Sequence, residues 1–191
     1  YETHFEERHM PPSNALHSVM VPGEQRYLVG PLARVNNCYD ELGPAARRAA
    51  DSCGIDWPSS NNFQSIVARA IEVVGAYEEA IEIVKDYQCE PAEPRILYEP
   101  RAGEGCHATE APRGLIYHRY RIGEDGKIAE AKIVPPTSQN QGCIENDLRE
   151  FVPTVAEYDD AEATRRCEHL IRNYDPCISC ATHFLTMTID R

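Results

Sequence analysis

The sequence predicts a mainly α-helical fold with a small β-hairpin layer. Apolar residues recur at steps of three and four over residues 62–87, which is the pattern of an amphipathic helix. Two shorter segments, 142–151 and 159–173, predict further helices. Residues 115–134 instead alternate with a period of two around a Gly-Glu-Asp-Gly turn, which predicts one antiparallel hairpin.

The N-terminal part of the chain gives weaker signals. Residues 1–25 are polar and interrupted by prolines, so we expect an irregular segment there. A short apolar block covers 27–33, and a helix is expected over about 40–52. The Glu-rich outer face of helix 62–87 is interpreted as a solvated surface.

The stretch between the long helix and the hairpin is also expected to be irregular. Pro91, Pro94 and Pro100 exclude a helix, because proline lacks a backbone donor and clashes with the preceding turn. Gly103 and Gly105 continue this composition. We therefore interpret residues 101–114 as a loop.

Composition bounds the class of protein. The 191 residues carry a net charge of −12, which excludes nucleic acid and an anionic membrane surface as main partners. No apolar run approaches the roughly 20 residues of a membrane span. Six of the eight cysteines are scattered singly, which is typical of a reducing compartment, so we expect a cytoplasmic protein.

A tight cysteine pair lies near the C-terminus, within Asp-Pro-Cys-Ile-Ser-Cys-Ala-Thr-His. Cys177 and Cys180 are spaced to bind one soft or borderline metal ion from a turn. A redox dithiol would open a helix after a strand, whereas this pair follows a helix and a proline. The remaining alternative is two packed cysteines without a role.

Arg113 is the second candidate. Pro112 fixes the chain before it, so the guanidinium is presented from a rigid position at the start of the hairpin. Such a group can bind an anionic ligand or direct a proton. From the residues alone, a structural ion pair with Glu110 is the favoured alternative.

The third candidate is the segment 133–140, which leaves the hairpin through Pro135-Pro136. Its four small polar residues could offer donors beside an apolar wall, as a pocket for small polar diatomic ligands would need. Equally, they could cap the following helix, and the residues alone favour the cap.

Together, these motifs resemble the large subunit of [NiFe] hydrogenases. The shared order is Gly-x-Gly and Glu-Ala-Pro-Arg-Gly at 103–114, a hairpin, Pro-Thr-Ser-x-Asn at 136–140, and Asp-Pro-Cys-x-x-Cys-x-x-His at 175–183. The segment 27–36 is similar to a family segment as well. The motif Pro-Thr-Ser-Gln-Asn at 136–140 is similar to that of the soluble branch of the family, whose members pass electrons to NAD(P), deazaflavin or a disulfide reductase.

This resemblance implies a helical-bundle fold and a role for each motif residue. Cys177 would be a terminal nickel ligand, and Cys180 would bridge nickel and iron. Arg113 would lie over the open metal position and help to split dihydrogen heterolytically.

The resemblance also implies two further groups of residues. Pro112, Pro136 and Thr137 would line the pocket for the cyanide and carbonyl ligands of the iron. His183 would bind a nearby magnesium ion (or iron), with the Ile133 carbonyl as another ligand. Hard oxygen donors suit magnesium, as soft thiolates suit nickel.

Two departures from the family pattern set expectations about the chain. The family's N-terminal Cys-x-x-Cys pair and its acidic proton-relay residue are absent, and six cysteines lack that spacing and are interpreted as packed or incidental: Cys38, Cys53, Cys89, Cys106, Cys143 and Cys167. With the start at Tyr1, this predicts that 1–183 is the C-terminal part of a large-subunit domain, from a fragment or a split subunit. Residues 184–191 would be a tail of the kind that a maturation protease trims, and a retained tail implies a nickel-free precursor or a member that is never cut.

The leading hypothesis is therefore part of the catalytic subunit of a [NiFe] hydrogenase, H2 ⇌ 2H+ + 2e−, with electrons leaving through an iron–sulfur small subunit. Without the N-terminal half of the large subunit, the chain is expected to be inactive and to expose a large apolar surface. One alternative is a zinc-stapled binding domain that uses Cys177, Cys180, His183 and Cys106. The other is a metal-free relative of the NADH dehydrogenase large subunit, against which the cysteine pair argues.

Overall fold

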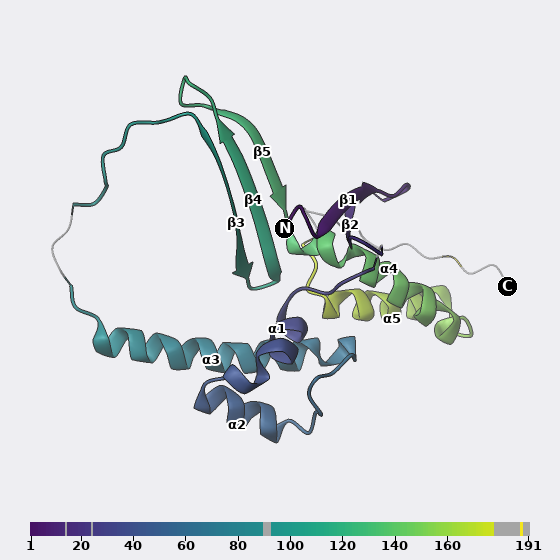
Figure 1. The fold of residues 1–191 in the computed structure, drawn as a ribbon. Coiled ribbons are helices and arrows are strands. Elements are labelled where there is room, and N and C mark those ends of the chain that lie inside the picture. The colour runs from purple at the N-terminus through teal and green to yellow at the C-terminus, as the bar shows by residue number, and fades with distance from the viewer. Residues whose placement is uncertain (14, 24, 90–92, 178–187, 189–191) are drawn as a thin grey trace.

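The computed structural model describes residues 1–13, 15–23, 25–89, 93–177 and 188, and it is mainly helical with two small antiparallel sheets (Figure 1). The helices are α1 (Pro31–Cys38), α2 (Pro44–Ser52), α3 (Ser65–Asp86), α4 (Pro136–Val155) and α5 (Asp160–Asn173), with short 3-10 turns at Tyr39–Glu41 and Asn62–Gln64. The strands are β1 (Phe5–His9), β2 (Leu16–Met20), β3 (Gly103–Ala111), β4 (Gly114–Ile122) and β5 (Ile128–Val134).

Several predicted elements are confirmed. Helix α3 falls within the predicted 62–87, and β4 and β5 form the predicted hairpin, with Tyr117 opposite Val134. Helix α5 begins as expected at an acidic cap, where the Asp159 carboxylate accepts the Glu162 N–H at 2.8 Å.

The irregular segment expected over 1–25 is wrong, because β1 and β2 form an antiparallel hairpin. The Tyr1 ring stacks on Phe5 and on Tyr117, with ring centroids 4.9 and 4.7 Å apart. This hairpin is held by contacts with α4 and β4, far away in sequence. The polarity of residues 1–25 gives no information about such long-range contacts, so the hairpin could not be predicted from it.

The loop expected before the hairpin is also corrected. β3 pairs with β4 along its whole length, from Gly103 opposite Ile122 to Ala111 opposite Gly114. Its side chains are mostly exposed, so β3 lacks the apolar alternation that would mark it as a strand. Pairing with the β4 backbone, rather than burial, makes it one.

Three helices begin on a proline: α1, α2 and α4 start at Pro31, Pro44 and Pro136. Proline suits this position because its fixed φ is helical and its missing N–H has no helical partner there. Helix α4 therefore begins six positions before the predicted residue 142. The apolar block at 27–33 likewise leads into α1.

The core consists of two packed groups. Helices α1 and α2 cover the first half of α3, where Val35, Ala68, Ala46 and Ile71 are buried. Helices α4 and α5 pack on each other in a second group. The N-terminal end of α4 contacts β4 and so joins the second group to the three-stranded sheet (Figure 1).

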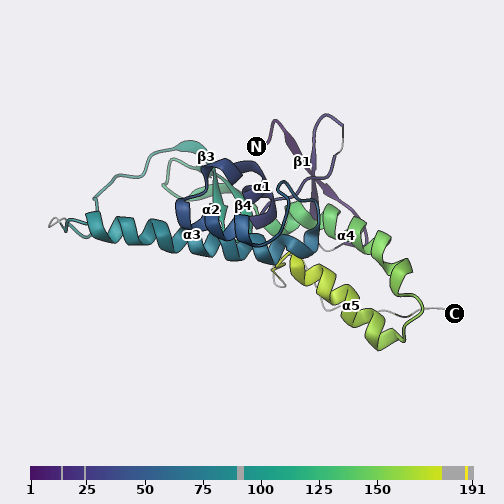
Figure 2. The same ribbon diagram turned by 90° about the horizontal axis from the view of Figure 1, so that it is seen from below.

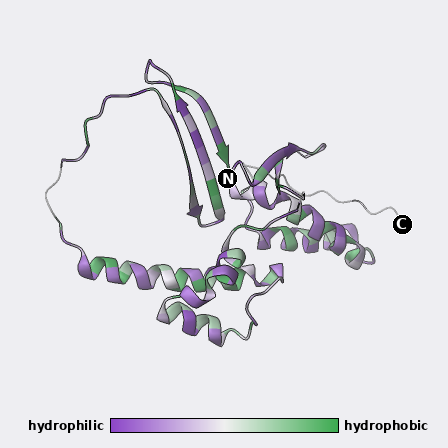
Figure 3. Cartoon of the chain, viewed as in Figure 1, coloured by the Kyte–Doolittle hydropathy of each residue, from purple (hydrophilic) through white to green (hydrophobic). Residues whose placement is uncertain are grey.

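The second half of α3 extends beyond α1 and α2 (Figure 2). Its apolar side chains are exposed, Tyr77 to 70% and Val84 to 74%, and Figure 3 shows apolar residues continuing to the end of this helix. This matches the exposed apolar surface expected from the sequence. Among the described helices, none combines the length and apolar character needed to cross a bilayer.

Candidate functional site

The segment that follows α5 brings Cys177 to the first turn of α4. Asp175 adopts a left-handed conformation, with φ 49°, directly after the helix. The Tyr174 ring is buried and its hydroxyl donates to Asp147 at 2.6 Å, which anchors the turn on α4. The Cys177 N–H then donates to Thr137 Oγ1 at 3.1 Å. Two predicted site residues, 40 positions apart, are thus in contact.

Arg113 reaches the same segment from the β3–β4 turn. Its Nε donates to the Asp175 carbonyl at 2.9 Å and lies 3.3 Å from Asp175 Oδ2. The ion pair with Glu110 considered from the sequence is wrong, because the Glu110 carboxylate instead binds Arg34 at 2.7 Å. The side chain of Arg113 is half exposed, and its contacts with Asp175 are made through Nε.

Arg34 holds the β3–β4 turn against α3. It forms a two-bond ion pair with Glu72, at 2.6 and 2.8 Å, and donates to the carbonyls of Ala111 and Pro112 at 2.9 and 3.0 Å. Desolvation lowers the pKa of this guanidinium, but hydrogen bonds with Glu72 and Glu110 outweigh it and leave the pKa raised. The position of Pro112 is therefore set by a cation from α1.

Arg69 adds a second link, from α3. Its Nη1 lies 3.2 Å from Asp175 Oδ2 and 3.4 Å from the Pro112 carbonyl. Asp175 thus lies between two arginines, Arg69 and Arg113. Their charges balance its carboxylate and fix the turn that carries Cys177.

Two glycines allow close backbone packing beside this turn. Both have positive φ: 115° at Gly30 and 134° at Gly114. A Cβ on Gly30 would meet the Arg113 carbonyl at 2.8 Å, and one on Gly114 would meet Val29 Cγ2 at 2.7 Å. Larger residues would push the two segments apart and move Arg113.

The first turn of α4 is polar and buried. Thr137, Ser138, Gln139 and Asn140 are all at most 5% exposed. The cap favoured from sequence is wrong, because Pro135 is the N-cap residue and no side chain caps the helix.

These polar side chains instead bind other segments of the chain. Gln139 Nε2 donates to the Leu115 carbonyl at 2.6 Å. Asn140 accepts the Val29 N–H at 2.8 Å and donates to its carbonyl at 2.9 Å. The turn that carries Thr137 is therefore tied to both β4 and the segment before α1.

The other predicted site residues are placed less closely, or not at all. Pro136 is buried beside Thr137, and Pro112 is exposed at the β3–β4 turn. Ile133 lies on β5 opposite His118, with its side chain half exposed. Cys180 and His183 lie outside the described residues, as does the tail 184–191 apart from Thr188.

The described donors fit one part of a metal centre. No group of three or more His, Cys, Asp or Glu side chains with metal-binding geometry occurs within the described ranges. Cys177 contributes one soft sulfur donor, and hydrogen bonds from Arg113 and to Thr137 fix the backbone at Asp175 and Cys177, which suits a thiolate ligand. Cys106, a ligand in the zinc alternative, lies exposed on β3.

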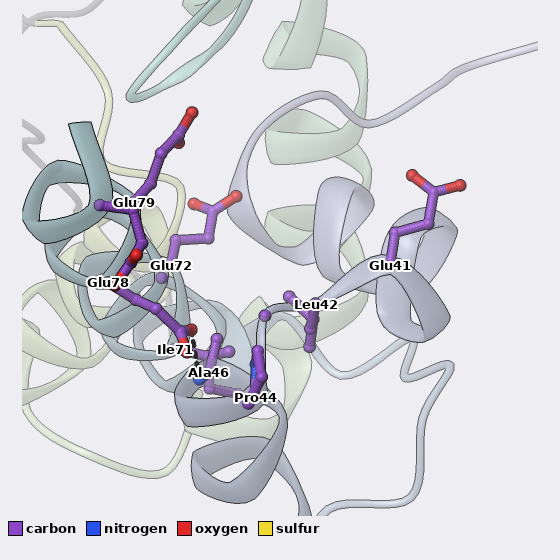
Figure 4. A pocket seen from close by; sticks show the side chains of 11 residues that line it. Glu41, Leu42, Pro44, Ala46, Ile71, Glu72, Glu78 and Glu79 are labelled. Atoms are coloured by element: carbon purple, nitrogen blue, oxygen red, sulfur yellow. Dashed lines mark hydrogen bonds between the residues drawn. The ribbon is translucent and has the colours of Figure 1, made fainter. Parts of the chain in front are cut away.

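A separate hollow of about 520 Å³ lies between α2 and α3 (Figure 4). Ile71 and Ala46 lie at its apolar side, while Glu72, Glu79 and Glu41 line the rest. Glu78 has a structural task there, because its carboxylate accepts the Ala45 N–H at 2.9 Å at the start of α2. These carboxylates include the Glu-rich face that the sequence suggested to be solvated.

Comparisons with known proteins match the fold of this chain. A crystal structure of an NAD+-reducing [NiFe]-hydrogenase in the H2-reduced state matches with a TM-score of 0.80 and 25% identity, over 96% of this chain and 42% of that one. A [NiFeSe]-hydrogenase from Dm. baculatum matches in fold, with a TM-score of 0.63. The fold is thus that of a hydrogenase subunit.

A family model described as nickel-dependent hydrogenase matches residues 23–183, and the chain belongs to this family. Sulfhydrogenase 1 subunit alpha of Pyrococcus furiosus is 30% identical over 84% of this chain. The NAD-reducing hydrogenase HoxS subunit beta of Cupriavidus necator is 33% identical over 82%. The chain spans 38% and 34% of the length of these two relatives.

Sequence reasoning missed the arginines that support the site. Arg34 lies in the segment 27–36 that resembles the family, so a signal for it existed. Arg69 carries no such signal, since a polar residue in an amphipathic helix is ordinary. Only the folded chain brings it beside Asp175.

Proposed function

We propose that this chain carries part of the active site of a [NiFe] hydrogenase, which catalyses H2 ⇌ 2H+ + 2e−. One observation supports it most directly: Arg113 and Thr137, from different elements, both bind the short segment Asp175–Cys177. A thiol, a permanent cation and a buried hydroxyl thus converge from three distant parts of the sequence.

The residues proposed to hold metal are the C-terminal motif residues. Cys177 and Cys180 would bind the nickel–iron centre, and His183 with the Ile133 carbonyl would bind a magnesium ion (or iron). When bound, the nickel–iron centre would act as a Lewis acid that polarises dihydrogen.

Residues of the chain would orient ligands around that centre. Thr137 Oγ1 accepts the Cys177 N–H, so its own O–H remains available to donate to a cyanide or carbonyl ligand. Pro112 and Pro136 lack N–H groups and would form the apolar wall of that pocket. Arg113, held through Nε, would present its terminal N–H groups to dihydrogen as it separates into charged parts.

The complete enzyme would need more protein than this chain. Residues 1–183 would be the C-terminal part of the large-subunit domain, joined to an N-terminal half that carries the second cysteine pair. Electrons would pass to an iron–sulfur small subunit and then to a soluble cofactor in the cytoplasm. Residues 184–191 would be the segment that a maturation protease removes.

Arg113→Lys in the assembled enzyme tests the catalytic part of this proposal. Lysine keeps the charge but loses the planar fork, so we expect H2 oxidation to fall about 100-fold, the effect of removing one preorganised donor. Nickel and iron contents should not change. Arg101→Lys, in the exposed loop before β3, is the matched control and should retain activity. Unchanged H2 oxidation in Arg113→Lys would contradict the role of this residue.

Metal analysis tests the binding part. The assembled enzyme should contain one nickel per large subunit together with a larger amount of iron, because the iron–sulfur subunit adds its own, and Cys177→Ala should lose nickel. One zinc ion per chain, without nickel, would instead support the zinc-stapled domain.

A further inference from the structure

A second hollow, of about 230 Å³, lies between the N-terminal hairpin and α4, away from Cys177. Its charged lining comes from separate elements. Arg8 lies on β1, His17 on β2, Arg26 on the following loop, and Glu145 and Arg149 on α4.

The lining is cationic, although the chain as a whole has a net charge of −12. Three arginines face one carboxylate there. Arg26 donates to the neutral amide oxygen of Asn146 at 2.7 Å, so its charge is not neutralised by that contact. Arg149 is exposed and has no hydrogen bond or ion pair within the described part of the chain. Arg8 pairs with Glu6, which is not part of the lining, at 2.9 Å.

His17 contributes a buried polar atom. Its side chain is only 7% exposed, and within the described residues its Nε2 has no hydrogen-bond partner. The Glu145 Oε1 atom lies 3.1 Å from this nitrogen, at ion-pair distance but without hydrogen-bond alignment. A carboxylate oxygen thus already occupies the space beside His17, and buried polar atoms are rarely left without a partner.

The shape of the site favours a small ligand over a flat protein partner. The arginines surround a hollow that leads to a side chain nine-tenths buried, rather than forming a flat basic surface. Guanidinium groups bind phosphate oxygens with paired, charge-assisted hydrogen bonds. A volume of about 230 Å³ is below that of pockets for drug-sized ligands, which suits one or two phosphate groups.

We propose that this hollow is an oxyanion site that binds a phosphate or diphosphate group, with Arg26 and Arg149 as the principal ligands. Arg8 lines the same hollow, and the Glu145 carboxylate beside His17 opposes binding because it carries the same sign of charge as the ligand. This inference does not depend on the proposed hydrogenase activity.

Isothermal titration of the full 191-residue chain, at constant ionic strength set with NaCl, tests the site. The probes are inorganic phosphate, pyrophosphate and ADP. We expect saturable binding of one pyrophosphate, and Arg149→Ala should weaken it about tenfold by removing one charge-assisted contact. If ADP binds as tightly as pyrophosphate, the site recognises only the phosphate groups. If ADP binds more tightly, the site also recognises the nucleoside, and the ligand is a nucleotide.

Two further variants separate this site from general charge attraction. Glu145→Gln removes the opposing carboxylate and should tighten pyrophosphate binding several-fold, which loss of folding cannot mimic. Arg48→Ala, an exposed arginine on α2, is the matched control and should leave binding unchanged. The proposal is overturned if the unchanged chain shows no saturable binding, or if Arg48→Ala weakens binding as much as Arg149→Ala.

Discussion

The two halves of α3 have the same kind of sequence and different surroundings. In the first half, Ala68 and Ile71 are buried under α1 and α2. In the second half, Tyr77, Ile81 and Val84 continue the apolar periodicity into solvent. Helical periodicity therefore reports that a face is suited to be covered, but it does not report which part of a protein covers it.

The largest expected effect comes from removing a side chain in the covered half. Ile71 is 2% exposed, so Ile71→Ala should lower the free energy of unfolding by about 3 kcal/mol, through lost burial and a cavity. Urea denaturation of the chain measures this. Ile81→Ala, the same change at a site 53% exposed, should cost less than about 0.5 kcal/mol. Equal losses at both sites would show that the second half is covered by another copy of the chain.

A smaller effect is expected at the ion pair that holds the covered half to the sheet. Arg34→Ala should lower the free energy of unfolding by about 2 kcal/mol, because it leaves the half-buried Glu72 without its cation. Lys85→Ala, which breaks the exposed pair with Glu82 on the other half of α3, should cost less than about 0.5 kcal/mol. Urea denaturation again gives both values. A loss from Lys85→Ala as large as that from Arg34→Ala would remove the distinction between the halves.

The reactivity of two cysteines extends the comparison between covered and exposed regions without a substitution. Cys89 lies exposed just beyond α3, whereas burial raises the pKa of the Cys143 thiol on α4 to about 11. Near pH 8, iodoacetamide should alkylate Cys89 at least about tenfold faster than Cys143, because burial shields the Cys143 sulfur and its raised pKa leaves little of it as the reactive thiolate. Peptide mass spectrometry over time measures both rates, and comparable rates would contradict the burial of Cys143.

The raised pKa of the Cys143 thiol also makes the stability of the folded chain depend on pH. In the unfolded chain this thiol ionises near pH 9, before it does in the folded chain, so the folded state loses stability as pH rises from 9 toward 11. Cys143→Ala should reduce that part of the alkaline loss, measured by thermal unfolding at pH 8 and pH 10.5.

Elements that depend on contacts between residues close in sequence could be predicted, and elements that depend on contacts between distant residues could not. Helix α3, the β4–β5 hairpin and the cap of α5 depend on neighbours a few positions away, and their patterns are visible. The β1–β2 hairpin and β3 depend on distant partners, such as the stacking of Tyr1 on Tyr117, and they were not predicted.

The residues of the candidate site likewise divide into those marked by sequence motifs and those that contribute only through contacts distant in sequence. Motif spacing marked Arg113, Thr137 and Cys177, and the fold brings these regions together. The contribution of Arg69 was not visible, because its two partners lie 43 and about 106 positions away. Cooperation between such distant residues exists only in the folded chain.

The buried first turn of α4 limits how this region can change in length. Successive residues of an α-helix are rotated by about 100°, since 3.6 residues complete a turn. One residue inserted between Thr137 and Ser138 would rotate Gln139 and Asn140 relative to Thr137, so the contacts with the Leu115 backbone, the Val29 backbone and Cys177 could not all be kept. This helical turn should therefore tolerate substitution far better than insertion or deletion.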